Sequence, residues 1–307
     1  MSSPGRVAAA VDVIIINYNA GGLLVDCVRS LLGDDVHQVI VVDNQSADDS
    51  LARLETLAIA AERLRVIRND RNLGFSAACN IGVSASSADR LLFLNPDATM
   101  ASQALSRMLE VLDADDSVGM AGGMLCNPDG SEQPGGRRTF PTPGRAFIRA
   151  FGLSWLHRVA PRVFPDFLQH QAPLPAEPVA VEAISGACML VKRVAVDDVG
   201  LWDEAYFLHC EDLDWCMRFW QKGWKVIFVP NARVAHVWGA CSRSRPVFVE
   251  WHKHHGMLRF YRKFYRQRYP RLLWGLVTAG VCLRFALLAV YHSLRQVLNK
   301  LGVARVR

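Results

Sequence analysis

The fold is decided by the stretch Val11-Asp-Val-Ile-Ile-Ile-Asn-Tyr18, a short apolar run that ends in polar residues. Three more runs of this kind follow it, and helix-like stretches separate them. The predicted strands are 11–18, 38–43, 65–69 and 90–95, and the predicted helices are 22–32, 48–61 and 76–87. Short runs rich in Val, Ile and Leu are typical of strands buried on both faces. Their alternation with helices predicts an α/β fold with a mostly parallel, Rossmann-like sheet flanked by helices.

Polar clusters follow the predicted strands at their carboxyl ends. They are Asn17-Tyr18-Asn19, Asp43-Asn44-Gln45-Ser46, 69–72 and Asn95-Pro96-Asp97. Ligands of parallel α/β sheets bind beyond the carboxyl ends of the strands, so these clusters predict the binding edge. The pattern Ser46-Ala-Asp-Asp49 is also a capping signal, and it predicts that Ser46 begins the helix over 48–61.

The alternation stops between 127 and 178, where nine prolines and the pair Gly135-Gly136 interrupt the chain. This composition predicts a long irregular insertion with one short helix around 145–156, and such loops are usually lids, binding loops or disordered segments. Regular structure is expected to resume at 179–192, followed by a helix over 213–222 and strands over 225–229 and 233–238.

The composition excludes several classes of protein. Of the 307 residues, 51% are hydrophobic and 21% are charged, which excludes a disordered or collagen-like chain. The eight cysteines form no CxxC pair, so a zinc ribbon or thioredoxin-type site is not expected. Scattered cysteines suit a reducing compartment. The first ten residues lack the apolar core of a signal peptide, so secretion is not expected.

Four segments, in order along the chain, resemble the family 2 glycosyltransferases, which have the GT-A fold. The segments are 13–19, 41–50, 72–98 and, in three pieces, 186–191, 207–216 and 236–239. The resemblance covers 11–245, and the run 250–265 looks most like bacterial rhamnosyltransferases. It implies a GT-A-like sheet and an inverting sugar transfer in cell-wall or O-antigen polysaccharide synthesis. The implied donor is dTDP-rhamnose, and the implied acceptor is a polyprenyl-diphosphate-linked saccharide.

The resemblance also implies a divalent cation, Mg²⁺ or Mn²⁺, beside the diphosphate of the donor. These ions prefer oxygen ligands and neutralise a leaving diphosphate. Asp97 is the expected metal carboxylate, and His236 is either a second ligand or a structural histidine. The family often has Asp-x-Asp where this chain has Asn95-Pro96-Asp97, so Asn95 is expected to contact the sugar or ribose. Three turn-forming residues also fit a plain turn at this place.

By the same resemblance, a set of residues at the predicted sheet edge is expected to bind the donor nucleotide. The set is Asn17, Asn19, Asp43, Asn44, Asn72, Gly74 and Asn95. Within it, Asp43 is expected to accept a hydrogen bond from the imide N–H of the pyrimidine. Gly74 is expected to permit a close backbone approach or a positive φ. A helix-capping carboxylate is the other interpretation of Asp43.

The segment Glu211-Asp-Leu-Asp214 places three carboxylates together. Crowded carboxylates raise one another's pKa and are costly without a function or a counter-charge. The family match implies that Asp212 is the base that takes the proton of the acceptor hydroxyl. Gly186, Trp202, Asp203 and Glu211 are expected to line the acceptor site or to support this base. An acidic first helical turn and a core Trp202 would explain the same residues without catalysis.

The chain is expected to have a catalytic domain over 11–245 and a basic-aromatic helical tail over 246–307. Residues 251–307 contain twelve Lys and Arg and no Asp or Glu. Cations mixed with aromatic rings over 251–271 suit an anionic membrane surface. Residues 272–291 have Arg284 as their one charged side chain, and a run of this length can just span a bilayer.

The tail therefore predicts attachment at the cytoplasmic face of the plasma membrane, either embedded in the bilayer or lying in its interface. The alternatives are a helix packed on the catalytic domain and a homo-oligomer interface. Both leave the catalytic prediction unchanged.

Three rival functions fit parts of the sequence. The first is the same fold with a UDP-sugar donor, galactofuranosyl or hexosyl. The second is a non-catalytic protein whose basic tail binds nucleic acid. The carboxylate cluster disfavours it, so no nucleic-acid partner is expected. The third is an inactive scaffold, because Asn95 stands where the family usually has an aspartate.

Overall fold

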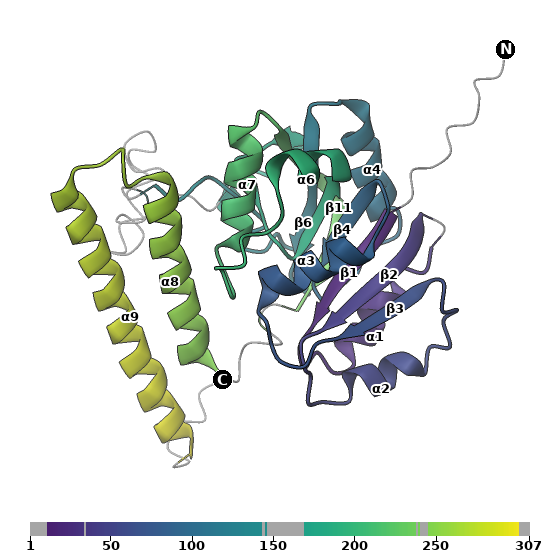
Figure 1. The fold of residues 1–307 in the computed structure, drawn as a ribbon, viewed down its shortest axis with the longest axis horizontal. Helices are drawn as coiled ribbons and strands as arrows, with labels where there is room; N and C mark the ends of the chain where they lie inside the picture. Colours follow the sequence, from purple (N-terminus) through teal and green to yellow (C-terminus); the bar gives the residue numbers. More distant parts are fainter. Residues whose placement is uncertain are drawn as a thin grey trace. The chain divides into compact units, whose positions relative to one another are not determined.

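The computed structural model describes residues 11–33, 35–142, 145, 169–237, 239 and 245–300. The chain, drawn in Figure 1, divides into two compact units. The sheet unit comprises residues 1–140, 168–207 and 211–241, and the hairpin unit comprises residues 141–167, 208–210 and 242–307. Apart from Arg145, the helix predicted over 145–156 lies outside the described residues.

The sheet unit contains a nine-stranded sheet in the order β3-β2-β1-β4-β10-β6-β11-β5, with β8 paired to β11. Its strands are β1 (Val11–Asn17), β2 (Val36–Asp43), β3 (Leu64–Arg68), β4 (Arg90–Leu94), β5 (Ala98–Met100), β6 (Val118–Cys126), β8 (Val179–Ala180), β10 (Cys188–Lys192) and β11 (Lys225–His236). Strands β5, β8 and β10 are antiparallel to their neighbours, and the others are parallel. The predicted mostly parallel sheet is confirmed. β7 (Arg137–Arg138) and β9 (Ala183–Ile184) form a second, two-stranded sheet.

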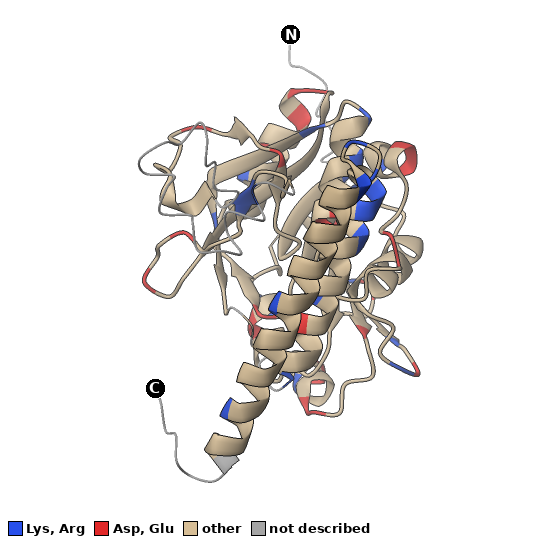
Figure 2. Ribbon diagram, turned by 90° about the vertical axis from the view of Figure 1, so that its left-hand side faces the viewer, with Lys and Arg blue, Asp and Glu red and all other residues tan. Residues whose placement is uncertain are grey.

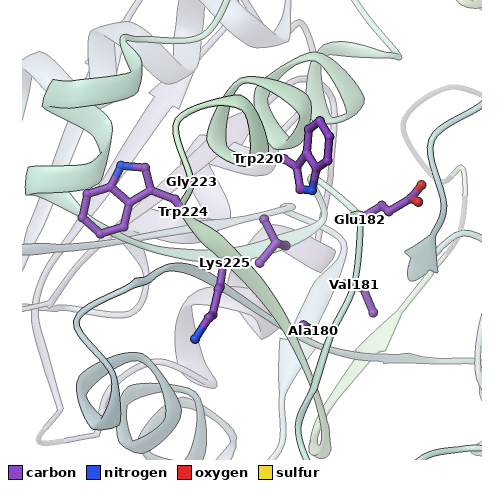
Figure 3. A pocket seen from close by; sticks show the side chains of 8 residues that line it. Ala180, Val181, Glu182, Trp220, Gly223, Trp224 and Lys225 are labelled. Carbon is purple, nitrogen blue, oxygen red and sulfur yellow. The ribbon is translucent and has the colours of Figure 1, made fainter.

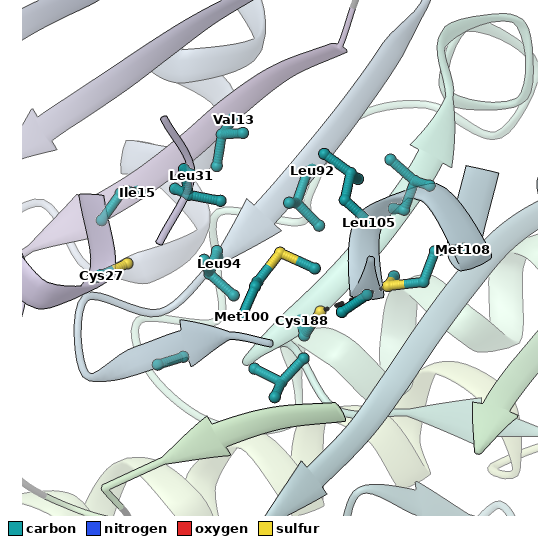
Figure 4. Packing of buried hydrophobic residues seen from close by; sticks show 14 of the residues in the cluster. Val13, Ile15, Cys27, Leu31, Leu92, Leu94, Met100, Leu105, Met108 and Cys188 are labelled. Carbon is teal, nitrogen blue, oxygen red and sulfur yellow. Dashed lines mark hydrogen bonds between the residues drawn. The ribbon is translucent and has the colours of Figure 1, made fainter. Parts of the chain in front are cut away.

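Helices cover both faces of the large sheet, as the apolar strands require. They are α1 (Leu23–Arg29), α2 (Ser50–Glu55), α3 (Phe75–Ala85), α4 (Ala104–Ala114), α6 (Arg193–Val199) and α7 (Glu211–Gln221), and a short 3₁₀ turn, η2, covers Gln169–Gln171. Val13 and Ile15 of β1 pack in one core with Cys27 of α1 and Met108 of α4 (Figure 4). Ile14 faces the other layer, where a Cβ on Gly82 of α3 would clash with its Cγ2. Successive residues of β1 are therefore buried on opposite faces.

The carboxyl ends of the parallel strands form one polar edge. Asn17, the last residue of β1, is paired with Asp43, the last residue of β2. The end of β4 lies beside the start of β10, because Leu94 is paired with Cys188 in the antiparallel register. The polar clusters that follow these strands are thereby collected along one side of the sheet.

The predicted cap of the second helix is wrong. Helix α2 begins at Ser50 and ends at Glu55, so it is also shorter than predicted. The Ser46 hydroxyl instead accepts hydrogen bonds from Asn17 Nδ2 and from the backbone N–H of Asn19, both at 3.0 Å. Tertiary partners from the first strand therefore take the hydroxyl that the local pattern assigned to the helix.

Two strand predictions also need correction. The strands predicted over 225–229 and 233–238 are the single strand β11, whose register shifts between Val229 and Arg233 without ending the pairing. The stretch 179–192 is divided into β8, β9 and β10, because its segments pair with different partners, β11, β7, and β4 with β6. The boundaries of these strands depend on their pairing partners, and a local sequence pattern does not reveal partners that are distant in sequence.

The hairpin unit contains two long helices, α8 (Pro246–Phe264) and α9 (Arg271–Lys300), which lie side by side. His254 donates its Nδ1–H to the backbone carbonyl of Glu250 (2.7 Å), so its Nε2 accepts a hydrogen bond from Arg284 Nη1 (2.9 Å). The charged side chain in the apolar run of α9 is thus bound by α8. By length and composition, Arg271–Asn299 is long and apolar enough to cross a membrane, and none of its most apolar window is buried.

Candidate active site

Helix α7 places the predicted base at its first turn, on the polar edge. Asp212 Oδ2 accepts hydrogen bonds from Arg138 Nη2 (2.5 Å) and from the backbone N–H of Gly186 (3.2 Å). Its Oδ1 accepts the backbone N–H of Leu213 (2.8 Å). Arg138 also donates to the carbonyl of Ile184 (2.7 Å), so β7 and β9 hold the guanidinium in place. A cation and a small-residue turn therefore orient the Asp212 carboxylate.

The neighbouring carboxylate, Glu211, is in a different electrostatic state. Burial, and secondly the charge of Asp212, raise the pKa of Glu211 to about 8. Its Oε2 is buried and has no hydrogen-bond partner among the described residues. At pH 7 Glu211 is therefore mostly protonated, while the Arg138 guanidinium contacts Asp212. Neighbouring acids in unlike environments are typical of sites that perform proton transfer.

Asp97 and His236 form a second buried polar pair. His236 Nε2 lies 3.3 Å from Asp97 Oδ1. Gln133 Nε2 donates to the backbone carbonyls of His236 (2.6 Å) and Cys126 (3.3 Å), and these acceptors determine which way its amide points. Gln133 Oε1 therefore accepts the Nδ1–H of His236 (2.8 Å). In the neutral form of the ring this hydrogen bond places the proton on Nδ1, so Nε2 then presents a lone pair to Asp97.

This pair fits a divalent cation. A carboxylate oxygen and an unprotonated imidazole nitrogen are both acceptors, so they repel each other unless a proton or a cation lies between them. Asp97 Oδ1 is buried without a hydrogen-bond partner in the described part of the chain. No cluster of three or more His, Cys, Asp or Glu occurs there either. Ions such as Mg²⁺ and Mn²⁺ need few protein ligands when phosphate and water supply the others.

The Asp97–His236 pair and Asp212 lie along the same polar edge. Asn95 Nδ2 lies 3.4 Å from His236 Nε2, and the Asn95 backbone N–H donates to the carbonyl of Ala187 (3.0 Å). The preceding residue, Gly186, donates its N–H to Asp212. A continuous series of contacts therefore runs from Asp97 through His236, Asn95 and the 186–187 turn to Asp212.

Asn17 and Asp43 form a buried network at the ends of β1 and β2. Asn17 Nδ2 lies 2.7 Å from Asp43 Oδ1, and Asp43 Oδ2 accepts the backbone N–H of Ser46 (3.1 Å). Asn17 Oδ1 is buried with no hydrogen-bond partner among the residues described. The network holds Asp43 in one orientation at the edge. Its contact with a pyrimidine stays a prediction.

Gly74 meets both conditions expected of it. Its φ is +87°, and a Cβ there would lie 2.7 Å from the carbonyl oxygen of Phe207. Asn44 Nδ2 donates to the Gly74 carbonyl (3.0 Å), and Asn72 Oδ1 accepts the Gly74 N–H (2.9 Å). Asn19 Oδ1 similarly accepts the backbone N–H of residue 47 (2.7 Å). These asparagines shape the loops of the polar edge.

Trp202 and Asp203 are less closely tied to the edge. Trp202 is 2% exposed, and its ring packs 4.1 Å from that of Trp215. Asp203 Oδ1 accepts the backbone N–H of Ala205 in a turn (3.1 Å). These contacts match the core interpretation of Trp202. Asp214 is fully buried and accepts a hydrogen bond from Arg218 Nε (2.8 Å), four residues later on α7.

Sequence reasoning missed Gln133 and Arg138. Both lie in the stretch that was interpreted as an irregular insertion, far from their partners in the chain. One feature of the sequence could have pointed to this segment: Glu132 and the pair Arg137-Arg138 are opposite charges close together among turn residues. Arg137 forms a buried ion pair with Glu132 (2.8 Å), so these charges are not a solvated surface.

A separate cavity of about 360 Å³ lies beside β8 and the end of α7 (Figure 3), lined by Ala180, Val181, Glu182, Trp220, Gly223, Trp224, Lys225 and Val226. Trp224 Nε1 donates to Asp198 (2.9 Å), and Lys225 Nζ donates to Asp115 (2.8 Å). Two of the polar groups around this cavity are therefore committed to other partners, and we assign it no ligand.

Comparison with known proteins adds a family and a fold. The family model described as glycosyl transferase family 2 matches residues 12–199, and the model described as glycosyl transferase family group 2 matches residues 166–304. The chain is 29% identical over 243 residues to the N-acetylglucosaminyl-diphospho-decaprenol L-rhamnosyltransferase of Mycobacterium tuberculosis, covering 74% of this chain and 75% of the relative. It is 24% identical to the dTDP-rhamnosyl transferase RfbF of Shigella flexneri, covering 82% and 77%.

Among solved structures, the fold is similar to a mannosyltransferase of Pyrobaculum calidifontis in complex with GDP-Man and Mn²⁺. The TM-score is 0.56 at 14% identity, over 99% of this chain and 85% of that one. It is also similar to GalNAc-T7 with UDP, GalNAc and Mn²⁺, with a TM-score of 0.57 at 18% identity. This match covers 76% of the chain but spans only 45% of GalNAc-T7. These likenesses confirm a GT-A-type sheet.

Proposed function

The chain belongs to glycosyl transferase family 2, and we propose that it transfers L-rhamnose from dTDP-rhamnose to a saccharide carried on a polyprenyl diphosphate. The observation that carries the proposal is the shared polar edge. One carboxylate, Asp212, is oriented there as a base, and a buried pair, Asp97 and His236, is suited to a cation beside a diphosphate. The two rhamnosyltransferase relatives support the choice of sugar and acceptor.

In this reaction the acceptor hydroxyl oxygen attacks the anomeric carbon from the side opposite the diphosphate. A carbon–oxygen bond forms while the bond to the diphosphate oxygen breaks, so the configuration is inverted. Asp212 takes the hydroxyl proton. Arg138 and Gly186 occupy Oδ2, so we assign the proton to Oδ1, which accepts one N–H from Leu213 and keeps a second lone pair.

Asp97 and His236 would hold the divalent cation, and Gln133 keeps His236 Nε2 unprotonated for it. A bound Mg²⁺ or Mn²⁺ would neutralise the charge that builds on the leaving diphosphate. The structural neighbours named with Mn²⁺ and a nucleotide or nucleotide sugar support this assignment. Asn17 and Asp43 are proposed to recognise the pyrimidine, with Asn19, Asn44, Asn72, Gly74 and Asn95 forming the loops around the donor.

We also propose that α9 attaches the enzyme to the cytoplasmic face of the plasma membrane, where a polyprenyl-linked acceptor would be found. The length and exposed apolar surface of α9 support this placement.

The test is product analysis with purified full-length protein. It would be incubated with a polyprenyl-diphosphate-linked N-acetylglucosamine and either dTDP-rhamnose or UDP-sugars, with and without EDTA. We expect mass spectrometry to detect addition of one deoxyhexose only from dTDP-rhamnose, loss of product with EDTA, and no product from Asp212→Asn. Transfer from a UDP-sugar alone would overturn the donor, and full activity of Asp212→Asn would overturn the base.

A further inference from the structure

The turn that joins α8 to α9 carries a cationic hollow that has no part in the proposed transfer. It has a volume of about 440 Å³ and is lined by Arg262, Lys263, Phe264, Arg266, Gln267 and Arg268. Basic positions gather at this end of the helix pair in Figure 2. No carboxylate lines the hollow among the described residues, and no Asp or Glu occurs over 251–307. The hollow is therefore a site of concentrated positive charge.

Aromatic rings pack together beside these basic residues. Phe260 packs against Phe264 (5.0 Å between ring centroids), and Tyr265 packs against Tyr269 (6.1 Å). The Arg268 guanidinium lies 5.9 Å from the centre of the Tyr265 ring. Stacking on a ring restricts a long cationic side chain, and tyrosines beside cations are typical of the membrane–water interface.

An exposed apolar surface begins immediately after the hollow. Leu272 is 78% exposed, and Leu276, Leu283 and Leu287 are all more than 60% exposed along α9. A soluble anion would use the cations alone, and a nucleic acid would leave this apolar surface in water. A lipid has a phosphate joined to apolar chains, so it is complementary to both features at once.

We propose that the hollow between Arg262 and Arg268 is a binding site for the headgroup phosphate of an anionic membrane lipid, whose chains lie against the exposed side of α9. This site is independent of the sugar transfer and of the sheet unit. It predicts that membrane binding depends on the position of the basic residues and not only on their number.

The test compares two charge-matched double variants of the full-length chain. Arg266→Gln/Arg268→Gln removes two cations from the hollow, and Lys253→Gln/Arg295→Gln removes two cations from elsewhere on α8 and α9. Binding is measured by flotation with phosphatidylcholine vesicles, and with vesicles in which about a fifth of the lipid is phosphatidic acid. The ratio of the two affinities removes the contribution of the apolar surface.

Each basic residue near an anionic surface contributes about fivefold to affinity. We expect Arg266→Gln/Arg268→Gln to lower the ratio of anionic to neutral vesicle affinity about 30-fold. Lys253→Gln/Arg295→Gln should lower this ratio less than about fivefold, because its residues lie outside the hollow. Equal losses in the two variants would overturn the site, because they would show attraction by total charge alone. Circular dichroism confirms that both variants fold.

Two further arms identify the source of the phosphate. Inorganic phosphate and a short duplex oligonucleotide are titrated against the wild-type chain without vesicles. We expect neither to bind as tightly as the anionic vesicles. Tight binding of either one that is lost in Arg266→Gln/Arg268→Gln would overturn the lipid assignment in favour of a soluble anion or a nucleic acid.

Discussion

Replacing Gln133 with leucine should weaken Mn²⁺ binding about 10- to 100-fold, the usual cost of removing a partner that orients a metal-binding histidine. In the structure Gln133 Oε1 is the acceptor for His236 Nδ1–H at 2.8 Å. Without it, the ring is free to carry its proton on Nε2, the atom that faces Asp97. Each tenfold loss corresponds to about 1.4 kcal/mol of binding free energy.

The same substitution should also destabilise the fold, because Gln133 donates to the buried carbonyls of Cys126 and His236. Each lost partner costs about 1–3 kcal/mol. Gln133→Glu separates the two effects. It loses these donations but keeps an oxygen that accepts the Nδ1–H, so it should be destabilised while Mn²⁺ affinity stays within a few-fold of wild type.

The assay is a Mn²⁺ titration followed by electron paramagnetic resonance in the presence of a nucleoside diphosphate, alongside urea unfolding. Gln38→Leu is the control, since its amide donates to the Glu62 carbonyl at an exposed position. Parallel losses of affinity and stability in the leucine and glutamate variants would refute the argument, because a merely structural Gln133 would affect both properties together.

Three further predictions concern other parts of the chain. Glu211→Gln should keep most of the transfer rate at pH 7, where the wild-type acid is mostly protonated. The pKa of Glu211 is raised from 4.5 to about 8 in the folded chain, so the free energy of unfolding of the wild type should fall as pH rises through that interval. Glu211→Gln should lack this fall. If urea unfolding gave the same dependence of the free energy on pH in both proteins, the assigned pKa would be wrong. Gly74→Ala should destabilise more than Gly223→Ala. Both positions have positive φ (+87° and +85°), which costs an alanine about 1–3 kcal/mol, but only at Gly74 would the added Cβ meet backbone atoms. Equal losses of stability in the two variants would count against this contact. Burial first, then the charges of Arg284 and Lys253, lower the pKa of His254, while the hydrogen bond and charge of Glu250 oppose this shift. The contact between α8 and α9 should therefore weaken as pH falls below 6.5 towards the folded value. Hydrogen exchange corrected for pH should show this loss in wild type and not in His254→Asn; the same loss in the variant would assign it elsewhere.

The periodicity of the apolar runs was enough to predict the sheet and its polar edge. Strands β1, β2 and β4 lie where their stretches rich in Val, Ile or Leu predicted them, because burial on both faces leaves a local, continuous signal. The predicted helix cap at Ser46 was wrong, because the Ser46 hydroxyl bonds to Asn17 and Asn19, which are distant in sequence and are not part of the local capping pattern. The two strands that proved to be β11 show the same limit, because pairing with β6 continues through a register shift.

For the site, the residue pattern was enough to predict which polar side chains are present and that they lie at the carboxyl edge of the sheet. Asp97 follows β4, one of the parallel strands that the alternation predicted, and His236 ends β11. Asp212 lies in the first turn of α7, and Gly186 precedes the antiparallel strand β10. The groups that hold these side chains in place became visible only in the folded chain. Arg138 reaches Asp212 across 74 residues, and Gln133 reaches His236 across 103, from a segment with no periodic signal. Hydrogen bonds act over about 3 Å, so which distant groups meet depends on the register and packing of the whole chain.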